Sequence, residues 1–299
     1  MKKILFSALL LVGLVGCSDG AVQENNLTEH SVAIFGGTED LNPKHDAVVS
    51  LFMEPEGTSY CTGTLIDPEW VLTAAHCVSN NGYAMSEAKY YKIGIGKNEK
   101  EVSQNLHDIT EIIYHENYKG DGNDVALVHL AFPINDIVPI KPLSPDIGLN
   151  NSENVNVEFV GFGYDENWDY GTKLTFTGIV SYFCGESGHS MYGCYFDGRQ
   201  MPFGSIYYTQ RNGGPCNGDS GGPAFLTVDG IEYVAGITSY GDSWCTIYGV
   251  STAVQSFYDW IVDKVPSLLE KDDNEDNAAD EEDFDIIDLP IEDISEIEE

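Results

Sequence analysis

The sequence has few basic residues. Its 14 Lys and Arg residues are outnumbered by 49 Asp and Glu residues, which gives a formal net charge of -35. A protein this acidic repels nucleic acid and anionic membrane surfaces, so a nucleic-acid-binding function is disfavoured. The sequence also has no internal repeat, no zinc-knuckle spacing of cysteines and no HExxH motif. We therefore expect no metal site and no required cofactor.

Long apolar segments are absent as well. At the amino terminus, Lys2 and Lys3 are followed by an apolar run of about thirteen residues. The run is too short to span a bilayer and is typical of the core of a signal peptide. Residues 1–16 are therefore predicted to be a signal peptide that directs export.

The end of this segment, Leu-Val-Gly-Cys at residues 14–17, resembles a bacterial lipobox, in which the cysteine is lipidated after signal cleavage. The alternative is an ordinary signal that leaves Cys17 as a stray thiol. Of the seven cysteines, six remain without Cys17, an even number that suits disulfides in an oxidising compartment and favours the lipoprotein. Ser18 after the cysteine resembles an outer-membrane sorting signal, if the cell is Gram-negative.

The rest of the chain divides by composition. Residues 17–33 are predicted to be the lipid-attachment residue followed by a polar propeptide or linker, and residues 34–268 to be the folded domain. Residues 269–299 are an acidic tail that is more than half Asp and Glu from Lys271 onward. Such a segment is expected to be disordered, although its scattered apolar residues leave room for a docking motif.

Between the termini, short runs of β-branched and aromatic residues alternate with turns rich in Gly, Asn, Pro and Asp. The clearest runs are AVVSLFM, YYKIGIG, NVEFVGFG, LTFTGIVSYF and EYVAGITSY. This pattern predicts an all-β sandwich or barrel. One helix is expected over residues 252–265, where Val254, Phe257, Ile261 and Val265 recur at helical spacing.

Three short motifs carry candidate chemistry. Ser220 stands in GGPCNGDSGGP, where glycines can expose a hydroxyl beside bare N–H groups, although such a stretch can also be a plain surface turn. His76 in VLTAAHCV can take the proton of a serine and return it to a leaving group. Asp124 in NDVALVHL enters an apolar strand, where its buried carboxylate needs a partner such as an imidazole N–H.

With these motifs in this order, residues 34–268 resemble the trypsin and chymotrypsin family of serine endopeptidases. The resemblance implies two six-stranded antiparallel β-barrels with a C-terminal helix, and a catalytic cleft between the barrels. It makes Ser220 the nucleophile, His76 the general acid and base, and Asp124 the residue that orients the histidine. The N–H groups of Gly218 and Ser220 would form the oxyanion hole. The alternative is a non-catalytic relative that serves as an adhesion or scaffolding module, but retention of all three residues favours the enzyme.

The resemblance also implies disulfides and a substrate pocket. The implied pairs are Cys61–Cys77 beside the histidine, Cys216–Cys245 beside the pocket, and Cys184–Cys194 as a local loop closure. The third pair departs from the family, which usually places its second cysteine nearer the serine motif, where Tyr208 stands. The implied pocket residues are Gly214, Pro215, Ser239, Tyr240, Gly241 and Gly249.

Trypsin-like members of the family carry an aspartate on the pocket floor, and here that position is Gly214. An open, uncharged pocket favours a large apolar or aromatic P1 residue, the residue before the scissile bond. Asp242 leaves an alternative open, because a basic P1 residue would be accepted if this carboxylate turned inward. Some relatives bind calcium in a loop that corresponds to residues 94–108, but the acidic residues there do not match that spacing.

The stretch SVAIFGGTED resembles the activation site of the family. Cleavage before Ile34 would free an ammonium group that folds inward and pairs with Asp219, so the chain is expected to be a zymogen. Ala33 replaces the usual arginine or lysine, which implies an activating protease that prefers small residues. If Cys17 is lipidated, the same cut releases the enzyme from the membrane. The alternative is that residues 18–33 are only a spacer and the chain works uncut.

The expected partners are therefore protein or peptide substrates, the activating protease, and a membrane reached through the N-terminal lipid before activation. We expect a monomer that is exported from a bacterial cell, either as an outer-membrane lipoprotein or as a secreted protein after activation.

Overall fold

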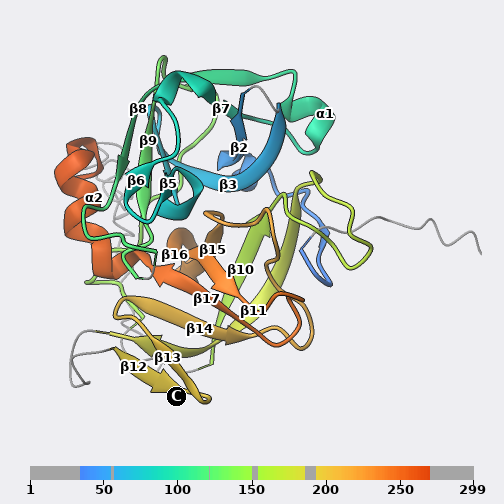
Figure 1. Cartoon of the computed structure of the whole chain (residues 1–299), viewed down its shortest axis with the longest axis vertical. Coiled ribbons are helices and arrows are strands. Elements are labelled where there is room, and N and C mark those ends of the chain that lie inside the picture. Colours follow the sequence, from blue (N-terminus) through green and yellow to red (C-terminus); the bar gives the residue numbers. More distant parts are fainter. Residues whose placement is uncertain (1–33, 55–56, 121, 150–153, 186–192, 270–299) are drawn as a thin grey trace, which may run out of the picture. The chain divides into compact units, whose positions relative to one another are not determined.

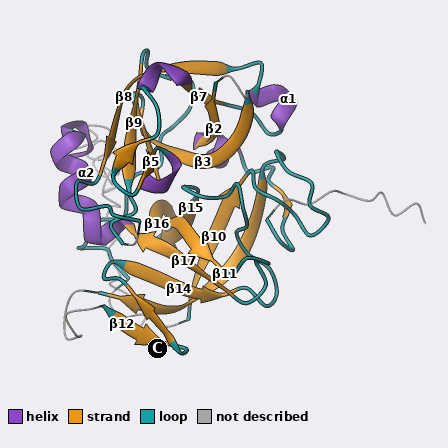
Figure 2. Cartoon of the chain, in the orientation of Figure 1, coloured by secondary structure: helices purple, strands orange, loops and turns teal. Residues whose placement is uncertain are grey.

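The computed structural model describes residues 34–54, 57–120, 122–149, 154–185 and 193–269. The predictions for the signal peptide, Cys17, Ala33 and the acidic tail after residue 269 lie outside these ranges. Among the described residues, those with regular secondary structure are mostly in β-strands, as Figure 2 shows. None of the helices in the described ranges combines the length and the apolar character that a membrane span requires.

The first barrel is closed by six antiparallel strands in the order β2-β3-β4-β9-β8-β7 (Figure 1). These strands are β2 (Val48–Met53), β3 (Thr58–Asp67), β4 (Trp70–Thr73), β7 (Tyr91–Gly94), β8 (Leu106–Tyr114) and β9 (Ala126–Leu130). The β-branched residues of β2 pack well on a pleated surface, and five of its six residues are buried. Leu51, Leu65 and Leu127 are fully buried in the core of this barrel.

The second barrel has the strand order β11-β10-β15-β16-β17-β14 and closes through a pairing of β14 with β11. Its strands are β10 (Val155–Gly161), β11 (Leu174–Cys184), β14 (Ser205–Thr209), β15 (Pro223–Val228), β16 (Ile231–Gly241) and β17 (Tyr248–Ala253). The short strand β1 (Thr38–Glu39) pairs with β11 outside the ring. The expectation of two six-stranded antiparallel barrels is therefore confirmed.

Two short hairpins complete the strands, β5 (Ser79–Asn80) with β6 (Tyr83–Ala84) and β12 (Cys194–Phe196) with β13 (Arg199–Met201). Local sequence accounts for their turns. Asn81 and Gly82 connect β5 to β6 with positive φ angles of 50° and 81°, as a two-residue hairpin turn requires. The short helices before the C-terminal segment are η1 (Pro43–Ala47), η2 (Ala75–Cys77), η3 (Ala88–Tyr90) and α1 (Glu99–Val102).

The helix expected over residues 252–265 begins later than predicted. Residues 252 and 253 still belong to β17, and the helical segment consists of η4 (Val254–Phe257), α2 (Tyr258–Lys264) and η5 (Pro266–Leu269). Pairing with β14 and β16 holds the end of β17 extended, which outweighs the helical spacing of its apolar residues. Phe257 and Ile261 pack into the core of the first barrel, and Figure 1 shows α2 beside β8 and β9. The chain thus returns from the second barrel to cover the first.

Three disulfides join the pairs that the resemblance implied. They are Cys61–Cys77, Cys184–Cys194 and Cys216–Cys245. The pair that departs from the family, Cys184–Cys194, ties the end of β11 to β12. Both of its cysteines are buried in a small cluster with Met201 and Tyr207.

Candidate active site

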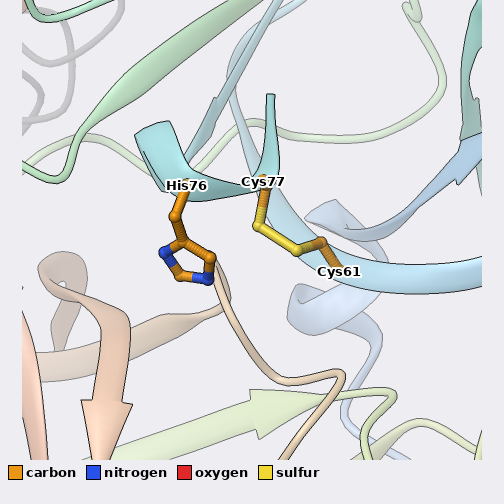
Figure 3. Close-up of side chains that lie close together, drawn as sticks. All are labelled: Cys61, His76 and Cys77. Carbon is orange, nitrogen blue, oxygen red and sulfur yellow. A yellow bond between two sulfur atoms is a disulfide. The ribbon is translucent and has the colours of Figure 1, made fainter. Parts of the chain in front are cut away.

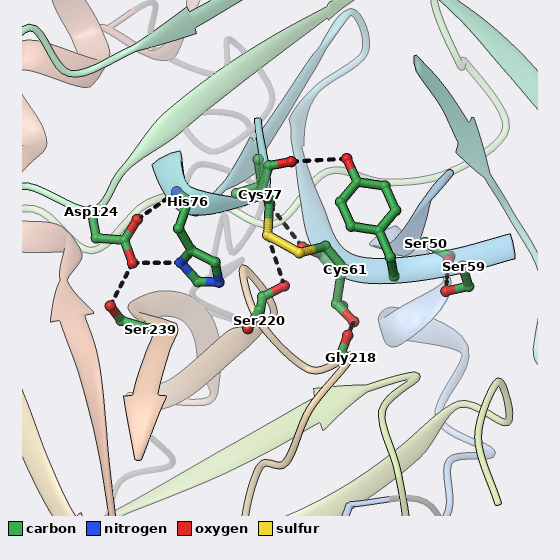
Figure 4. The surroundings of a disulfide bond; sticks show 12 residues. Ser50, Ser59, Cys61, His76, Cys77, Asp124, Gly218, Ser220 and Ser239 are labelled. Carbon is green, nitrogen blue, oxygen red and sulfur yellow. Dashed lines mark hydrogen bonds and ion pairs between the residues drawn. A yellow bond between two sulfur atoms is a disulfide. The ribbon is translucent and has the colours of Figure 1, made fainter. Parts of the chain in front are cut away.

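His76 and Asp124 lie together on the first barrel (Figure 4). The helical turn η2 follows β4 and carries His76, while Asp124 stands just before β9, the strand that pairs with β4. The backbone N–H of His76 donates to Asp124 Oδ1 at 2.9 Å, and His76 Nδ1 lies 2.7 Å from Asp124 Oδ2. Because a carboxylate can only accept, Nδ1 carries the proton, and Nε2 of the neutral ring is left as an acceptor.

The carboxylate of Asp124 is buried, and the residue is 5% exposed. The hydroxyl of Ser239, on β16, also donates to its Oδ2. Burial by itself would raise the pKa of Asp124, but the hydrogen bonds from His76 and Ser239 and the attraction of His76 hold it below its ordinary value. The sequence placed Ser239 only in the substrate pocket, whereas the structure also makes it a partner of Asp124. Both barrels therefore contribute to holding this carboxylate ionised.

Ser220 lies on the second barrel, in the loop that leads from Cys216 into β15. Its carbonyl oxygen accepts from the N–H of Thr62 at 2.8 Å, and Cys77 Sγ contacts the same oxygen at 3.5 Å. These contacts attach the loop to the first barrel beside His76, as Figure 4 shows. His76 and Ser220 line the same pocket, although no hydrogen bond joins the imidazole to the Ser220 hydroxyl in the described part of the chain.

The backbone at Gly218 has a conformation that only glycine accepts easily. Its φ is +98°, and a Cβ there would lie 2.7 Å from the Cα of Gly163. The hydroxyl of Thr62 donates to the Gly218 carbonyl at 2.9 Å and so orients the following peptide. Among the described residues, neither the Gly218 N–H nor the Ser220 N–H has an acceptor. Both donors are therefore free to bind a developing negative charge.

Asp219, between these two residues, is 1% exposed. Its carboxylate accepts from the N–H groups of Gly163 and Cys216, each at 2.8 Å. Burial raises the pKa of Asp219 to about 7, although the two N–H groups act in the opposite direction. Ile34 is fully buried, and the carbonyl of the next residue, Phe35, accepts from the N–H of Gly214. No hydrogen bond or ion pair joins Ile34 to Asp219 within the described ranges of this uncut chain.

A pocket of about 520 Å³ opens beside His76 and Ser220. Five of the six predicted pocket residues line it, namely Pro215, Ser239, Tyr240, Gly241 and Gly249. Gly214 differs, because the side chain of Gln210 lies in front of it and lines the pocket in its place. A Cβ on Gly214 would lie 2.6 Å from Gln210 Nε2. Gln210 thus adds a neutral residue to the lining of the pocket.

Asp242 is also among the residues that line the pocket, and its carboxylate is bound by backbone N–H groups of its own loop. Its Oδ1 accepts from the N–H groups of Ile247 and Tyr248 at 2.7 and 2.9 Å, and its Oδ2 from those of Trp244 and Thr246 at 3.2 and 3.3 Å. Burial raises the pKa of Asp242, but these four backbone donors outweigh it and leave the pKa below its ordinary value. The negative charge is held by its own loop.

A family model described as Trypsin matches residues 34–261 of the chain. The chain belongs to the trypsin family of serine endopeptidases. Brachyurin of Leptuca pugilator is 31% identical over 238 residues, which cover 76% of this chain and 96% of that protein. Urokinase-type plasminogen activator of Gallus gallus is 27% identical over 263 residues, which cover 80% of this chain but 58% of that protein. The chain is thus a hydrolase that acts on proteins, and its three disulfides are typical of an oxidising, extracellular compartment.

Two groups of potential metal ligands lie close together in the described part of this protease. The first consists of Cys61, His76 and Cys77 (Figure 3), but its two sulfurs are joined in a disulfide and provide no thiolate. The second consists of His45, Glu158 and Glu232, outside the active site. No local motif singles out His45, because its partners come from distant segments of the chain.

His45 is fully buried, and its ring nitrogens lie 3.0 Å from Asp40 Oδ1 and 3.4 Å from Glu232 Oε2. Burial lowers the pKa of His45, but the hydrogen bonds with both carboxylates prevail and raise it to about 9. The imidazolium therefore acts as the internal counter-ion of Asp40 and Glu232, which come from distant segments of the chain.

Proposed function

We propose that the protease cleaves peptide bonds through an acyl-enzyme formed on Ser220. The observation that carries the proposal is the buried carboxylate of Asp124, which binds both the backbone N–H and Nδ1 of His76. This arrangement leaves Nε2 to take the proton of the Ser220 hydroxyl as its oxygen attacks the scissile carbonyl. Nε2 then returns the proton to the leaving amine. In the second half of the reaction, water replaces the amine and follows the same proton path.

The negative charge of the tetrahedral intermediates is stabilised by the N–H groups of Gly218 and Ser220. Donors already oriented toward the position of a developing charge need no reorganisation during the reaction. The Thr62 hydroxyl donates to the Gly218 carbonyl, in the peptide between the two donors, and so helps to hold this loop in place. In a serine protease of another fold, removing one side-chain oxyanion-hole donor slows turnover by about a hundredfold to a thousandfold.

The triad is tested with Ser220→Ala, His76→Ala and Asp124→Asn, and with Ser103→Ala as a control at an exposed serine. Each triad variant is expected to lose several orders of magnitude in kcat, and double variants little more, because the residues act as a unit. Labelling by a fluorophosphonate probe should disappear in Ser220→Ala and remain in Ser103→Ala. Strictly additive losses, or labelling that survives in Ser220→Ala, would refute the shared mechanism.

The pocket favours a large apolar or aromatic P1 residue. The side chain in front of Gly214 is the neutral amide of Gln210, and the carboxylate of Asp242, which also lines the pocket, is bound by its own loop. A buried cation without a counter-charge is costly, which disfavours lysine and arginine. Cleavage profiling with a peptide library tests this preference, and a dominance of basic P1 residues would overturn it.

We further infer that the chain is made as a zymogen and is activated by a cut between Ala33 and Ile34. The buried position of Ile34 and the buried carboxylate of Asp219 support this step, since a new ammonium group would compensate an otherwise uncompensated charge. The protease domain extends over residues 34–268 in this proposal. Amino-terminal sequencing of the active protein tests it, because active protein that still carries residues 17–33 contradicts it.

Lipidation of Cys17 would couple this activation to release from a bacterial outer membrane. The sequence before Cys17 supports the proposal through its lysines, its short apolar core and its lipobox. Cell fractionation tests it: full-length protein should be membrane-bound and inactive, whereas protein that begins at Ile34 should be soluble and active. Active protein that remains membrane-bound with residues 17–33 attached would refute the coupling.

A further inference from the structure

Four aromatic side chains gather on two loops of the second barrel. Tyr164, Trp168 and Tyr170 belong to the loop between β10 and β11, and Trp244 belongs to the loop between β16 and β17. Trp168 is 49% exposed and Trp244 is 69% exposed. Exposed indoles are unfavourable in water, and a group of exposed aromatic residues is typical of a binding surface. We call these four residues the aromatic rim.

The rings of the aromatic rim contact one another in a continuous series. The ring centroid of Tyr164 lies 5.3 Å from that of Tyr170 and 6.0 Å from that of Trp168. Trp168 and Trp244 join the two loops, with ring centroids 6.2 Å apart and ring planes at 76°. This edge-to-face arrangement is attractive, yet it leaves a large part of both indoles exposed. The aromatic rim is therefore one surface and not four separate side chains.

Both loops of the aromatic rim are held by a carboxylate that accepts backbone N–H groups. Asp165 Oδ1 accepts from two N–H groups of its own loop, at 2.7 and 2.8 Å, and the N–H of Trp168 donates to the Asp165 carbonyl at 3.1 Å. Asp242 holds the other loop in the same way, and the N–H of Trp244 is one of its donors. Ordered loops lose little conformational entropy when a ligand binds to them. The two indoles are thus presented in a fixed arrangement.

The aromatic rim borders the substrate pocket at two points. Ser243 and Cys245, the chain neighbours of Trp244, both line the pocket. Asn217 lines it as well, and its carbonyl accepts from the N–H of Tyr164 at 2.8 Å. A peptide whose P1 side chain fills the pocket therefore has its neighbouring residues within reach of the rim.

The chemistry of the aromatic rim favours an apolar occupant. Its two loops, residues 164–171 and 242–247, contain no basic residue, so an acidic side chain finds no counter-charge there. The carboxylates of Glu166 and Asp242 already accept backbone N–H groups, that of Glu166 from Gly36 at 3.2 Å. The surfaces that remain to be buried are those of the indoles. An aromatic or large aliphatic side chain buries them without needing a charged partner.

We propose that Trp168 and Trp244 form a second specificity subsite, which binds an aromatic or large aliphatic side chain of the substrate outside P1. The inference rests on the proposed function, because the subsite acts on peptides that are held in the same catalytic site. Contact with the two indoles buries apolar surface and adds attraction between rings. A peptide with such a side chain at the right position is thus cleaved in preference to a peptide with alanine there.

The test uses internally quenched peptides that share one P1 residue, the residue that cleavage profiling finds best. Each peptide carries phenylalanine, alanine, arginine or glutamate at a single position between P4 and P2 or between P1′ and P3′. At the position that reaches the aromatic rim, we expect kcat/KM to be roughly tenfold higher with phenylalanine than with alanine. Arginine and glutamate should be poorer than phenylalanine at this position. The series is measured first on the unmodified protease.

Trp168→Ala and Trp244→Ala then remove the indoles one at a time. In each variant the ratio of phenylalanine to alanine cleavage at this position should fall to roughly a third or less, and a ratio within one variant cancels any general loss of activity. Trp168→Phe and Trp244→Phe keep a ring and should retain most of the preference. Phe132→Ala is the matched control, at a phenylalanine that is 76% exposed beyond the end of β9 opposite to Asp124. It should leave the ratio unchanged.

The outcomes separate this inference from the proposed function. If no position favours phenylalanine over alanine, or if the preference is unchanged in both Trp→Ala variants, the subsite is refuted and the catalytic proposal stands. Faster cleavage of an arginine peptide that is lost in the same variants would assign a cationic occupant and overturn the inference. No cleavage of any peptide together with no fluorophosphonate labelling refutes the proposed function, and the inference falls with it.

Discussion

The buried carboxylate of Asp219 makes the stability of the uncut chain depend on pH. Its pKa is raised to about 7 from the ordinary 3.8, chiefly by burial. When this carboxylate is ionised, a shift of this size lowers the unfolding free energy of the uncut protein by about 4 kcal/mol. Below pH 3.8 the group is protonated in both states and costs nothing. As the pH rises the unfolded chain ionises first, so stability falls until the pH passes about 7.

The perturbation is Asp219→Asn, made in a Ser220→Ala background that prevents self-cleavage. Asparagine cannot ionise, so this contribution to the pH dependence disappears. Between pH 5 and pH 8 the parent should lose about 3 kcal/mol of unfolding free energy more than the Asn variant loses. Urea denaturation at several pH values measures the difference, and comparing the two proteins cancels the titration of all other groups.

Cleavage before Ile34 should abolish this loss of unfolding free energy between pH 5 and pH 8, because the new ammonium group stabilises the ionised form of Asp219. The cleaved protein can be prepared with an enteropeptidase site in place of residues 29–33. If the unfolding free energies of the uncut parent and its Asn variant depend on pH in the same way, the carboxylate of Asp219 is not the uncompensated charge that we infer from its burial. If cleaved and uncut parents behave alike, the ammonium does not reach it, and the activation proposal fails.

Three further predictions concern single side chains. Ser239→Ala removes a donor to Asp124 and should lower kcat roughly tenfold in a peptide assay, and an unchanged kcat would show that this hydrogen bond has no role in catalysis. Gly249→Ala would place a Cβ against the ring of Tyr208 and should cost about 1–3 kcal/mol in urea denaturation, whereas an unaffected midpoint would mean that the ring can move aside. His45 has a pKa raised to about 9 from the ordinary 6.5, mainly by hydrogen bonds that outweigh burial, so its stabilisation is complete below pH 6.5 and is lost as the pH rises through 9. His45→Gln should accordingly destabilise the protein by about 3 kcal/mol at pH 6 and by less at pH 9.5, and an equal loss at both values would contradict the charge assigned to His45.

Much of the fold follows from local sequence. Runs such as LTFTGIVSYF carry β-branched and aromatic residues that favour extended backbone, and this run lies within β11. Turns such as Asn81-Gly82 accept positive φ angles and connect adjacent strands. The helix near the carboxyl terminus shows the limit of such patterns. Its first two predicted residues belong to β17, because pairing with two neighbouring strands is decided by contacts that the local pattern does not contain.

The sequence by itself determined the all-β class, the family, and the motifs that contain His76, Asp124 and Ser220. Each of these depends on short stretches whose residue types and spacing carry the information. Tertiary structure alone decided that Gln210 stands in front of Gly214 and that the carboxylate of Asp242 faces its own loop. The reason is physical: the direction of a side chain in a closed barrel depends on the register of strands that are distant in the chain, and on which backbone donors those strands leave unpaired.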